Sequence, residues 1–206
     1  MSLKKIVIID HGLGNILSLK RSISILGYSA SLTSDNDEIL NSSHIFLPGV
    51  GQFVKAVEIL KKKKLFNFLR SLKKKKILGI CLGMQLLYSY SDEEQGSEGL
   101  SFFKEKIKKI EIDENNRKDY KVPNIGWRKI IINNEDQILK NIKDFNFYFV
   151  HSYMAQYNKE NCLSYIDYSN IKIPAIVKVG NVYGCQFHPE KSSESGLQFI
   201  KNFIEI

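Results

Sequence analysis

Short apolar runs alternate with amphipathic segments along the first half of the chain. Runs rich in Ile, Val and Leu predict strands over residues 4–9, 28–33, 45–47 and 77–80. Apolar positions three and four apart predict helices over residues 16–26, 34–40, 53–60, 65–72 and 82–90. This alternation is typical of an α/β fold with an open, mostly parallel sheet and helices on both faces. Ligands of such sheets bind beyond the carboxyl ends of the strands.

The second half of the chain has few helical segments between its strands. Its apolar stretches predict strands over residues 102–112, 128–132, 145–150, 173–179 and 182–187, and a last helix over residues 194–204. Strands that follow one another without crossover helices favour antiparallel additions to the sheet. The sequence contains no evident linker or repeat, so residues 1–206 are predicted to form one domain.

Composition and charge narrow the class of protein. The chain is 43% hydrophobic and 25% charged, as expected of a globular protein, and no apolar run approaches the roughly 20 residues of a membrane span. Much of the net charge of +8 lies in lysine runs at 61–64 and 73–76. They lack the interleaved aromatics of a nucleic-acid site, so we interpret them as solvated surface, with attraction of an anionic ligand or an acidic partner as the alternative. Whether Met1, Ser2 and Leu3 are native is open.

The three cysteines at positions 81, 162 and 185 show no metal-binding spacing. No secretion signal precedes the first predicted strand, so we expect free thiols, a cytoplasmic location, and no metal or cofactor. Cys162 is expected in a polar loop, and both Cys162 and Cys185 are interpreted as structural. Cys81 is different because of its surroundings.

Cys81 stands between two glycines, after a predicted strand and before a predicted helix, in the stretch Gly79-Ile80-Cys81-Leu82-Gly83. This pattern is typical of a nucleophile elbow, where small neighbours permit a tight turn and the tip residue projects from the sheet. The positive end of the helix would stabilise a thiolate there. The alternative is a small, inert core cysteine.

A thiol nucleophile needs a base, and His188 is the candidate. Pro189 favours an extended backbone at His188, and in an extended chain residues two apart point to the same side. Glu190 can therefore orient the His188 imidazole, as the third member of a triad does.

A third motif is the glycine-bracketed turn 47–53, which follows a predicted strand. Glycine lets a backbone approach a ligand closely and turn a peptide plane. A backbone N–H of this turn, at Val50 or Gly51, is expected to form an oxyanion hole with the N–H of Leu82. An ordinary strand-to-helix turn is the alternative.

These motifs together resemble the class I (triad) glutamine amidotransferases, and within them the glutaminase subunits of imidazole glycerol phosphate synthase. The similarity covers nearly the whole chain. It rests on the segments D-H-G-L-G-N (10–15), P-G-V-G (48–51), G-I-C-L-G-M-Q-L-L (79–87), E-G-L (98–100), Y-F-V-H-S-Y (148–153) and Q-F-H-P-E-K-S-S (186–193).

The resemblance implies a role for each residue of the site. Cys81 would attack the glutamine amide, His188 would pass the proton to the leaving ammonia, and Glu190 would hold the ring. The positions implied to bind glutamine are Gly51, Gln85, Glu93, His151, Ser152 and Tyr153. For Glu93, an exposed carboxylate at a helix end is the alternative.

The resemblance also implies a partner, a (β/α)8-barrel cyclase or synthase that forms a heterodimer with the glutaminase and receives its ammonia. Asn15, Trp127 and Lys191 are expected at that interface. The family reads P-H-M-G-W-N where this chain has Asn124 and Arg128 at the second and last positions. We expect this segment to face the partner, so the change leaves open an alternative pathway, amidation of a surface-polysaccharide sugar.

Other functions fit less of the sequence. A cysteine hydrolase of the same fold would not need Glu190 or the strand at 151–153, and a non-catalytic module would not need the triad. The Gly12-x-Gly14 turn suggests dinucleotide binding, but its third glycine position is Leu17.

Overall fold

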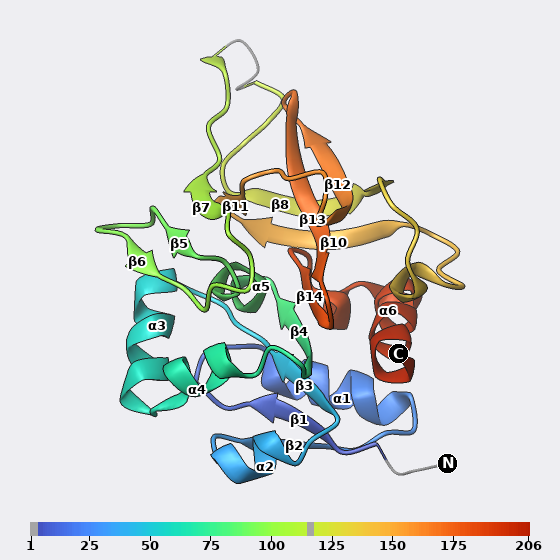
Figure 1. Ribbon diagram of the computed structural model, residues 1–206. Helices are drawn as coiled ribbons and strands as arrows, with labels where there is room; N and C mark the ends of the chain where they lie inside the picture. Colours follow the sequence, from blue (N-terminus) through green and yellow to red (C-terminus); the bar gives the residue numbers. More distant parts are fainter. Residues whose placement is uncertain (1–3, 115–117) are drawn as a thin grey trace.

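The computed structural model describes residues 4–114 and 118–206, and its largest layer is an eight-stranded sheet in the order β2-β1-β3-β4-β14-β13-β12-β9 (Figure 1). The first five strands of that order run parallel, and the remaining pairings are antiparallel. The predicted mixed α/β sheet is thus confirmed. The strands are β1 (Ile6–Ile9), β2 (Ala30–Thr33), β3 (His44–Leu47), β4 (Lys76–Ile80), β9 (Ile131–Ile132), β12 (Cys162–Tyr168), β13 (Ile171–Val179) and β14 (Val182–Cys185).

Helices cover both faces of this sheet, as the strand sequences require. Side chains alternate between the faces of a strand, so Ile6 and Ile8 pack into one core cluster, and Val7 and Ile9 pack into another. The first cluster includes α1 and α6, and the second includes α2 to α5. None of the helices in the described ranges is long and apolar enough to span a membrane. The helices are α1 (Ile16–Ile25), α2 (Asn36–Leu40), α3 (Phe53–Lys62), α4 (Leu65–Ser71), α5 (Leu82–Leu86) and α6 (Ser193–Glu205).

Two smaller sheets lie together at one end of the molecule, beyond β4 (Figure 1). One pairs β8 (Asn124–Lys129) with β10 (Asn146–His151), antiparallel. The other has the order β11-β7-β5-β6, and short 3-10 turns η2 and η3 complete the described elements. Their bounds are β5 (Tyr90–Ser91), β6 (Ser97–Glu98), β7 (Lys106–Lys109), β11 (Tyr153–Ala155), η2 (Gln137–Leu139) and η3 (Pro189–Lys191).

Several elements differ from the prediction. The helix predicted over 82–90 ends at Leu86, because N–H groups of Leu100 and Phe102 bond the carbonyls of Leu86 and Leu87 and the chain then enters β5. The strand predicted over 102–112 is only β7, and residues 128–132 divide between β8 and β9.

The expectation that Cys162 lies in a polar loop is wrong. Cys162 opens β12, is fully buried, and directs its thiol to the carbonyl of Ser164 at 3.1 Å. Burial raises the pKa of this thiol to about 12. A buried, neutral thiol at this place is consistent with the structural role expected for it.

Candidate active site

Cys81 lies on a sharp turn between β4 and α5. Its backbone has φ of 53° and ψ of −110°, a strained conformation for a residue with a side chain. The flanking glycines make the turn possible, because a Cβ at Gly79 would lie 2.6 Å from the carbonyl oxygen of Gly83. A Cβ at Gly83 would lie 1.7 Å from the carbonyl oxygen of Leu47. Glycine is therefore required on both sides of Cys81, because any larger residue would clash with the backbone of the nucleophile elbow.

Gly83→Ala should destabilise the fold by about 3 kcal/mol or more, since the clash is with backbone that cannot move aside. Thermal unfolding would measure the loss. Gly12→Ala is the matched control: Gly12 has φ of +80° with nothing within 4 Å of its added Cβ, so it costs only the roughly 1–2 kcal/mol of a left-handed residue. Equal losses in the two variants would show that the clash at Gly83 is relieved.

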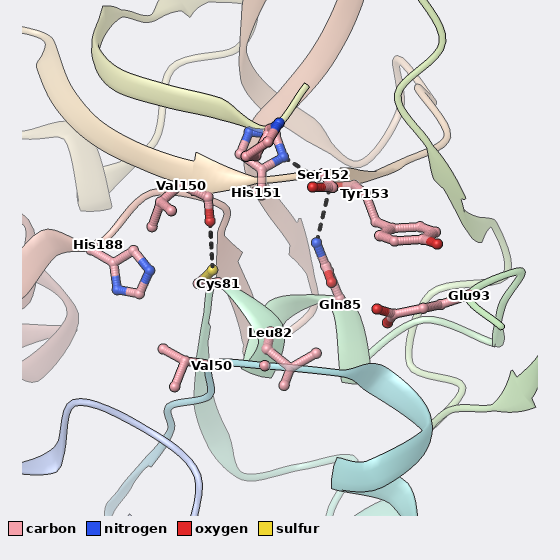
Figure 2. A pocket seen from close by; sticks show the side chains of 12 residues that line it. Val50, Cys81, Leu82, Gln85, Glu93, Val150, His151, Ser152, Tyr153 and His188 are labelled. Carbon is pink, nitrogen blue, oxygen red and sulfur yellow. Dashed lines mark hydrogen bonds between the residues drawn. The ribbon is translucent and has the colours of Figure 1, made fainter. Parts of the chain in front are cut away.

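His188 and Glu190 form a buried pair beyond β14. His188 Nδ1 donates to Glu190 Oε1 at 2.8 Å, with 2% and 3% of the two side chains exposed. Burial alone would lower the pKa of His188, but the charge of the nearby Cys81 and the hydrogen bond and charge of Glu190 outweigh it and raise the pKa to about 10. The ring is turned toward Cys81 (Figure 2), and its Nε2 is buried with no hydrogen-bond partner in the part of the chain that the structure describes. His188 can thus act as the proton carrier for the thiol.

The predicted site residues come together in one pocket of about 410 Å³, within the size range of small-molecule sites. They come from the turn after β3, the elbow, the β5–β6 loop, the β10–β11 segment and the chain after β14 (Figure 2). Glu190 is not in the lining and contacts the site through His188. The lining consists of Val50, Gly51, Cys81, Leu82, Gln85, Glu93, Pro123, Val150, His151, Ser152, Tyr153 and His188.

The predicted oxyanion hole is not open in this structure. The Leu82 N–H donates to the carbonyl of Gly49 at 3.3 Å, so a donor expected to face substrate is occupied. Gly51 has φ of +97°, a conformation that suits glycine. At the start of the same turn, the carbonyl of Pro48 forms a 2.6 Å hydrogen bond with Nε2 of the buried His11. A peptide rotation between Gly49 and Gly51 would free the Leu82 donor.

Glu93 lies at the opposite side of the pocket from His188 (Figure 2). It is half-buried in the β5–β6 loop, and its Oε2 accepts a 2.7 Å hydrogen bond from the N–H of Phe53, the first residue of α3. Burial raises the pKa of this carboxyl, although the Phe53 N–H opposes the shift. The alternative of an exposed carboxylate at a helix end does not describe this position.

The predicted interface residues lie on elements that contact one another, since α1, which follows Asn15, touches η3, which carries Lys191. Trp127 is 46% exposed and packs edge-on against Tyr148 with ring centroids 6.2 Å apart, and Lys191 Nζ lies 5.9 Å from the same ring. Asn15 is the residue before α1. The neighbouring Gly14 packs close to Pro48.

Asn124, which we expected to face the partner, is fully buried and points inward to His151. That expectation is wrong for Asn124, because strand alternation puts Asn124 and Arg128 on the face opposite to Trp127.

Three residues near the site were missed by the sequence reasoning. Gln186 is fully buried, accepts from Gln85 Nε2 at 3.0 Å, and has its own Nε2 at 3.8 Å from the sulfur of Cys81. Its position two residues before His188 was an available signal, since both then face the same side. For His11 and the inward-facing Asn124, the sequence carried no comparable signal.

Among residues 4–114 and 118–206, no three His, Cys, Asp or Glu side chains gather as a metal-binding group. The arrangement of thiol, imidazole and carboxylate is instead suited to acyl transfer.

Comparison with known proteins agrees with this chemistry. Residues 7–206 match the family model for class-I glutamine amidotransferases. The chain therefore belongs to the class I glutamine amidotransferase family, and it is a glutamine amidotransferase enzyme.

Curated relatives narrow the assignment. The imidazole glycerol phosphate synthase subunit HisH of Bacillus anthracis (strain CDC 684 / NRRL 3495) is 42% identical over 201 residues, covering 96% of this chain and 93% of that protein. HisH of Bacillus thuringiensis subsp. konkukian (strain 97-27) shows the same figures. These relatives support a glutaminase subunit of imidazole glycerol phosphate synthase.

Solved structures match the fold. PurLQS from Thermotoga maritima aligns with a TM-score of 0.73 at 16% identity, covering 98% of each chain. A glutamine amidotransferase crystal structure aligns with a TM-score of 0.72 at 15% identity, covering 97% of each chain.

Proposed function

We propose that the chain, as one domain, hydrolyses L-glutamine through Cys81, His188 and Glu190. The observation that carries the proposal is the buried 2.8 Å pair of His188 and Glu190, with the imidazole turned toward a cysteine on the elbow (Figure 2). The family assignment supplies glutamine as the substrate class.

The proposed reaction proceeds in two steps. His188 takes the proton of the Cys81 thiol, the sulfur attacks the side-chain amide carbon to form a C–S bond, and the C–N bond breaks as His188 gives that proton to the leaving ammonia. Water, deprotonated by His188, then cleaves the thioester and releases glutamate and the thiol. The raised pKa of His188 supports its role as the acid in the first step.

The glutamine-binding residues line the pocket away from the imidazole. In the proposal, the Glu93 carboxylate binds the ammonium group of glutamine, while Gln85, Gly51 and the segment 151–153 contact the remainder. The half-buried position of Glu93 supports this role, since an ion pair is stronger where water is excluded.

The occupied Leu82 N–H supports a dependence on a partner. A tetrahedral oxyanion needs hydrogen-bond donors that are free when charge develops. In this structure one of those donors, the Leu82 N–H, is bonded to the carbonyl of Gly49. We infer a nearly idle isolated chain and an activated complex, in which docking favours the rotated backbone of 49–51.

The partner in this proposal is a (β/α)8-barrel cyclase subunit, which forms a heterodimer with this chain and takes up the ammonia. An exposed apolar group near the pocket mouth supports a docking face there: Val50 is 40% exposed and Ile125 is 54% exposed, near the half-exposed Trp127. Delivery through a protein interior would keep ammonia from protonation in water. The free thiols of all three cysteines fit a cytoplasmic location.

The test is reconstitution with a barrel cyclase of histidine biosynthesis. Glutamine hydrolysis should rise by about 10²-fold or more on assembly, because the oxyanion donors contribute that much to the rate. A diazo-ketone glutamine analogue should add its mass to Cys81 alone.

Peptide or ester turnover without glutamine hydrolysis would contradict the proposal. Glutamine hydrolysis activated only by the barrel of a surface-sugar amidation pathway would leave the chemistry in place and replace the pathway.

A further inference from the structure

A chain of hydrogen bonds enters the pocket from β8. Arg128 Nε donates to Asn124 Oδ1 at 3.1 Å, and Asn124 Nδ2 lies 3.0 Å from His151 Nε2. Asn124 and His151 are cross-strand partners of β8 and β10. Arg128 is itself held in place, with its guanidinium 5.2 Å from the ring centre of the buried Tyr168.

The direction of every bond in this chain is determined by chemistry. A guanidinium only donates, so the side-chain oxygen of Asn124 must face Arg128 and its NH₂ group must face His151. His151 Nε2 must then accept, which places the ring proton on Nδ1. Nδ1–H donates to the carbonyl of Tyr153 at 2.8 Å.

The Tyr153 carbonyl connects this chain to the nucleophile. It also accepts from Gln85 Nε2 at 3.1 Å (Figure 2), and the same Nε2 donates to Gln186 Oε1 at 3.0 Å. Gln186 Nε2 lies 3.8 Å from Cys81 Sγ. One continuous set of bonds therefore runs from Arg128 to the sulfur.

The charges around His151 favour the neutral ring that this pattern requires. Burial lowers the pKa of His151 to about 4, and the charge of His188 lowers it further, against the Tyr153 carbonyl, which raises it. Among the described residues, His188 acts on the charge of His151 directly, and Arg128 is linked to His151 through Asn124. Both are cationic when charged, so neither stabilises a second imidazolium.

We propose that Asn124 and Arg128 are positioning residues for glutamine binding: they hold His151 as the Nδ1–H tautomer and so fix the Tyr153 carbonyl and the Gln85 amide beside Cys81. The inference rests on the proposed function of the pocket. It also explains two departures from the family pattern together, because Asn124 and Arg128 are the two ends of one hydrogen bond.

The first test measures the tautomer directly, without turnover. ¹⁵N-histidine labelling of the full chain, with His151→Asn to assign the signal, should show His151 as Nδ1–H at neutral pH. Asn124→Leu removes the donor to Nε2, so the Nε2 signal should move to that of a ring nitrogen that accepts no hydrogen bond, while the Tyr153 carbonyl keeps the proton on Nδ1. Asn124→Asp offers only acceptors, so His151 should become doubly protonated, and its titration midpoint should rise from about 4 to above neutral pH.

The second test is kinetic, in the complex with the barrel cyclase. Asn124→Leu should raise KM for glutamine about tenfold with a smaller change in kcat, because a buried polar group that holds the binding site is lost. Asn124→Asp should add a new ionisation to the pH profile of kcat/KM, which a loss of stability alone would not do. Lys159→Met, an exposed residue in the loop between β11 and β12 and outside the pocket lining, is the control and should match the wild type.

An unchanged Nε2 signal in Asn124→Leu, with KM within about twofold of wild type, would overturn the proposal. If Asn124→Leu does not fold, Arg128→Met decides by the same two measurements, since it keeps the contact with Tyr168 and removes the donor. If the wild-type complex does not hydrolyse glutamine, the proposed function fails, and the tautomer signal still tests the positioning of His151.

Discussion

In the assembled enzyme, Cys81→Ser is expected to lower glutamine hydrolysis by at least about 10³-fold, because a serine hydroxyl in a site built for a thiol is a far weaker nucleophile. Synthesis supported by added ammonium salts should continue at the wild-type rate, since the barrel subunit would receive ammonia from solution. The measurement is the ratio of glutamine-dependent to ammonia-dependent product formation. The fold should be retained, because the exchange changes one buried atom and leaves both flanking glycines in place.

Cys162→Ser is the matched control, since it makes the same exchange at a buried cysteine outside the pocket. It should keep both activities. Glutamine-dependent activity close to wild type in Cys81→Ser would remove Cys81 from the role of nucleophile. Loss of glutamine-dependent activity together with loss of co-purification with the barrel would indicate that the partner no longer docks, so co-purification of Cys81→Ser is measured as well.

The parallel half of the sheet could be predicted because its strands are short, apolar and separated by helices. β1, β3 and β4 are buried along almost their whole length, and buried parallel strands give continuous Ile, Val and Leu runs. The helix α3 could be predicted because it buries Phe53, Ala56, Val57 and Leu60, at helical spacing.

The antiparallel half was harder, because its pairings are irregular. β12 shifts register on both sides of Ser164, so its inward and outward positions do not follow one clean alternation. β5 and β6 contain two residues each, too few for any periodic signal. Such short strands form because neighbouring strands supply their hydrogen-bond partners, and local sequence patterns do not reveal which strands those are.

For the site, sequence predicted the residues whose chemistry has a local cause. The glycines around Cys81 and the two-residue spacing of His188 and Glu190 each follow from backbone geometry. What remained hidden depends on contacts between distant segments: the Leu82 N–H bonded to Gly49, and the Asn124 amide turned toward His151. These contacts determine whether the oxyanion donor is free and how His151 is held. The local motifs determine only which chemical groups the site contains.

Glu190→Gln is expected to reduce glutamine hydrolysis in the complex by about 10⁴-fold, as removal of an orienting carboxylate does in comparable triads. The carboxylate accepts the Nδ1–H of His188 at 2.8 Å. A glutamine amide can turn its NH₂ group toward Nδ1 instead, and the proton would then sit on Nε2, the nitrogen that must accept from Cys81. The change should therefore appear in kcat rather than in KM.

The same variant should change the dependence of stability on pH. The pKa of His188 is raised to about 10 from an ordinary value of 6.5, so its stabilising contribution is complete below pH 6.5 and is lost as the pH rises through about 10. Removing the Glu190 charge lowers that pKa, so the melting temperature should fall less steeply between pH 7 and pH 10 than in the wild type. Glu194→Gln, an exposed carboxylate on α6, is the control and should keep the wild-type slope and activity. Wild-type kcat in Glu190→Gln, together with an unchanged slope, would mean that Glu190 neither orients His188 nor sets its charge.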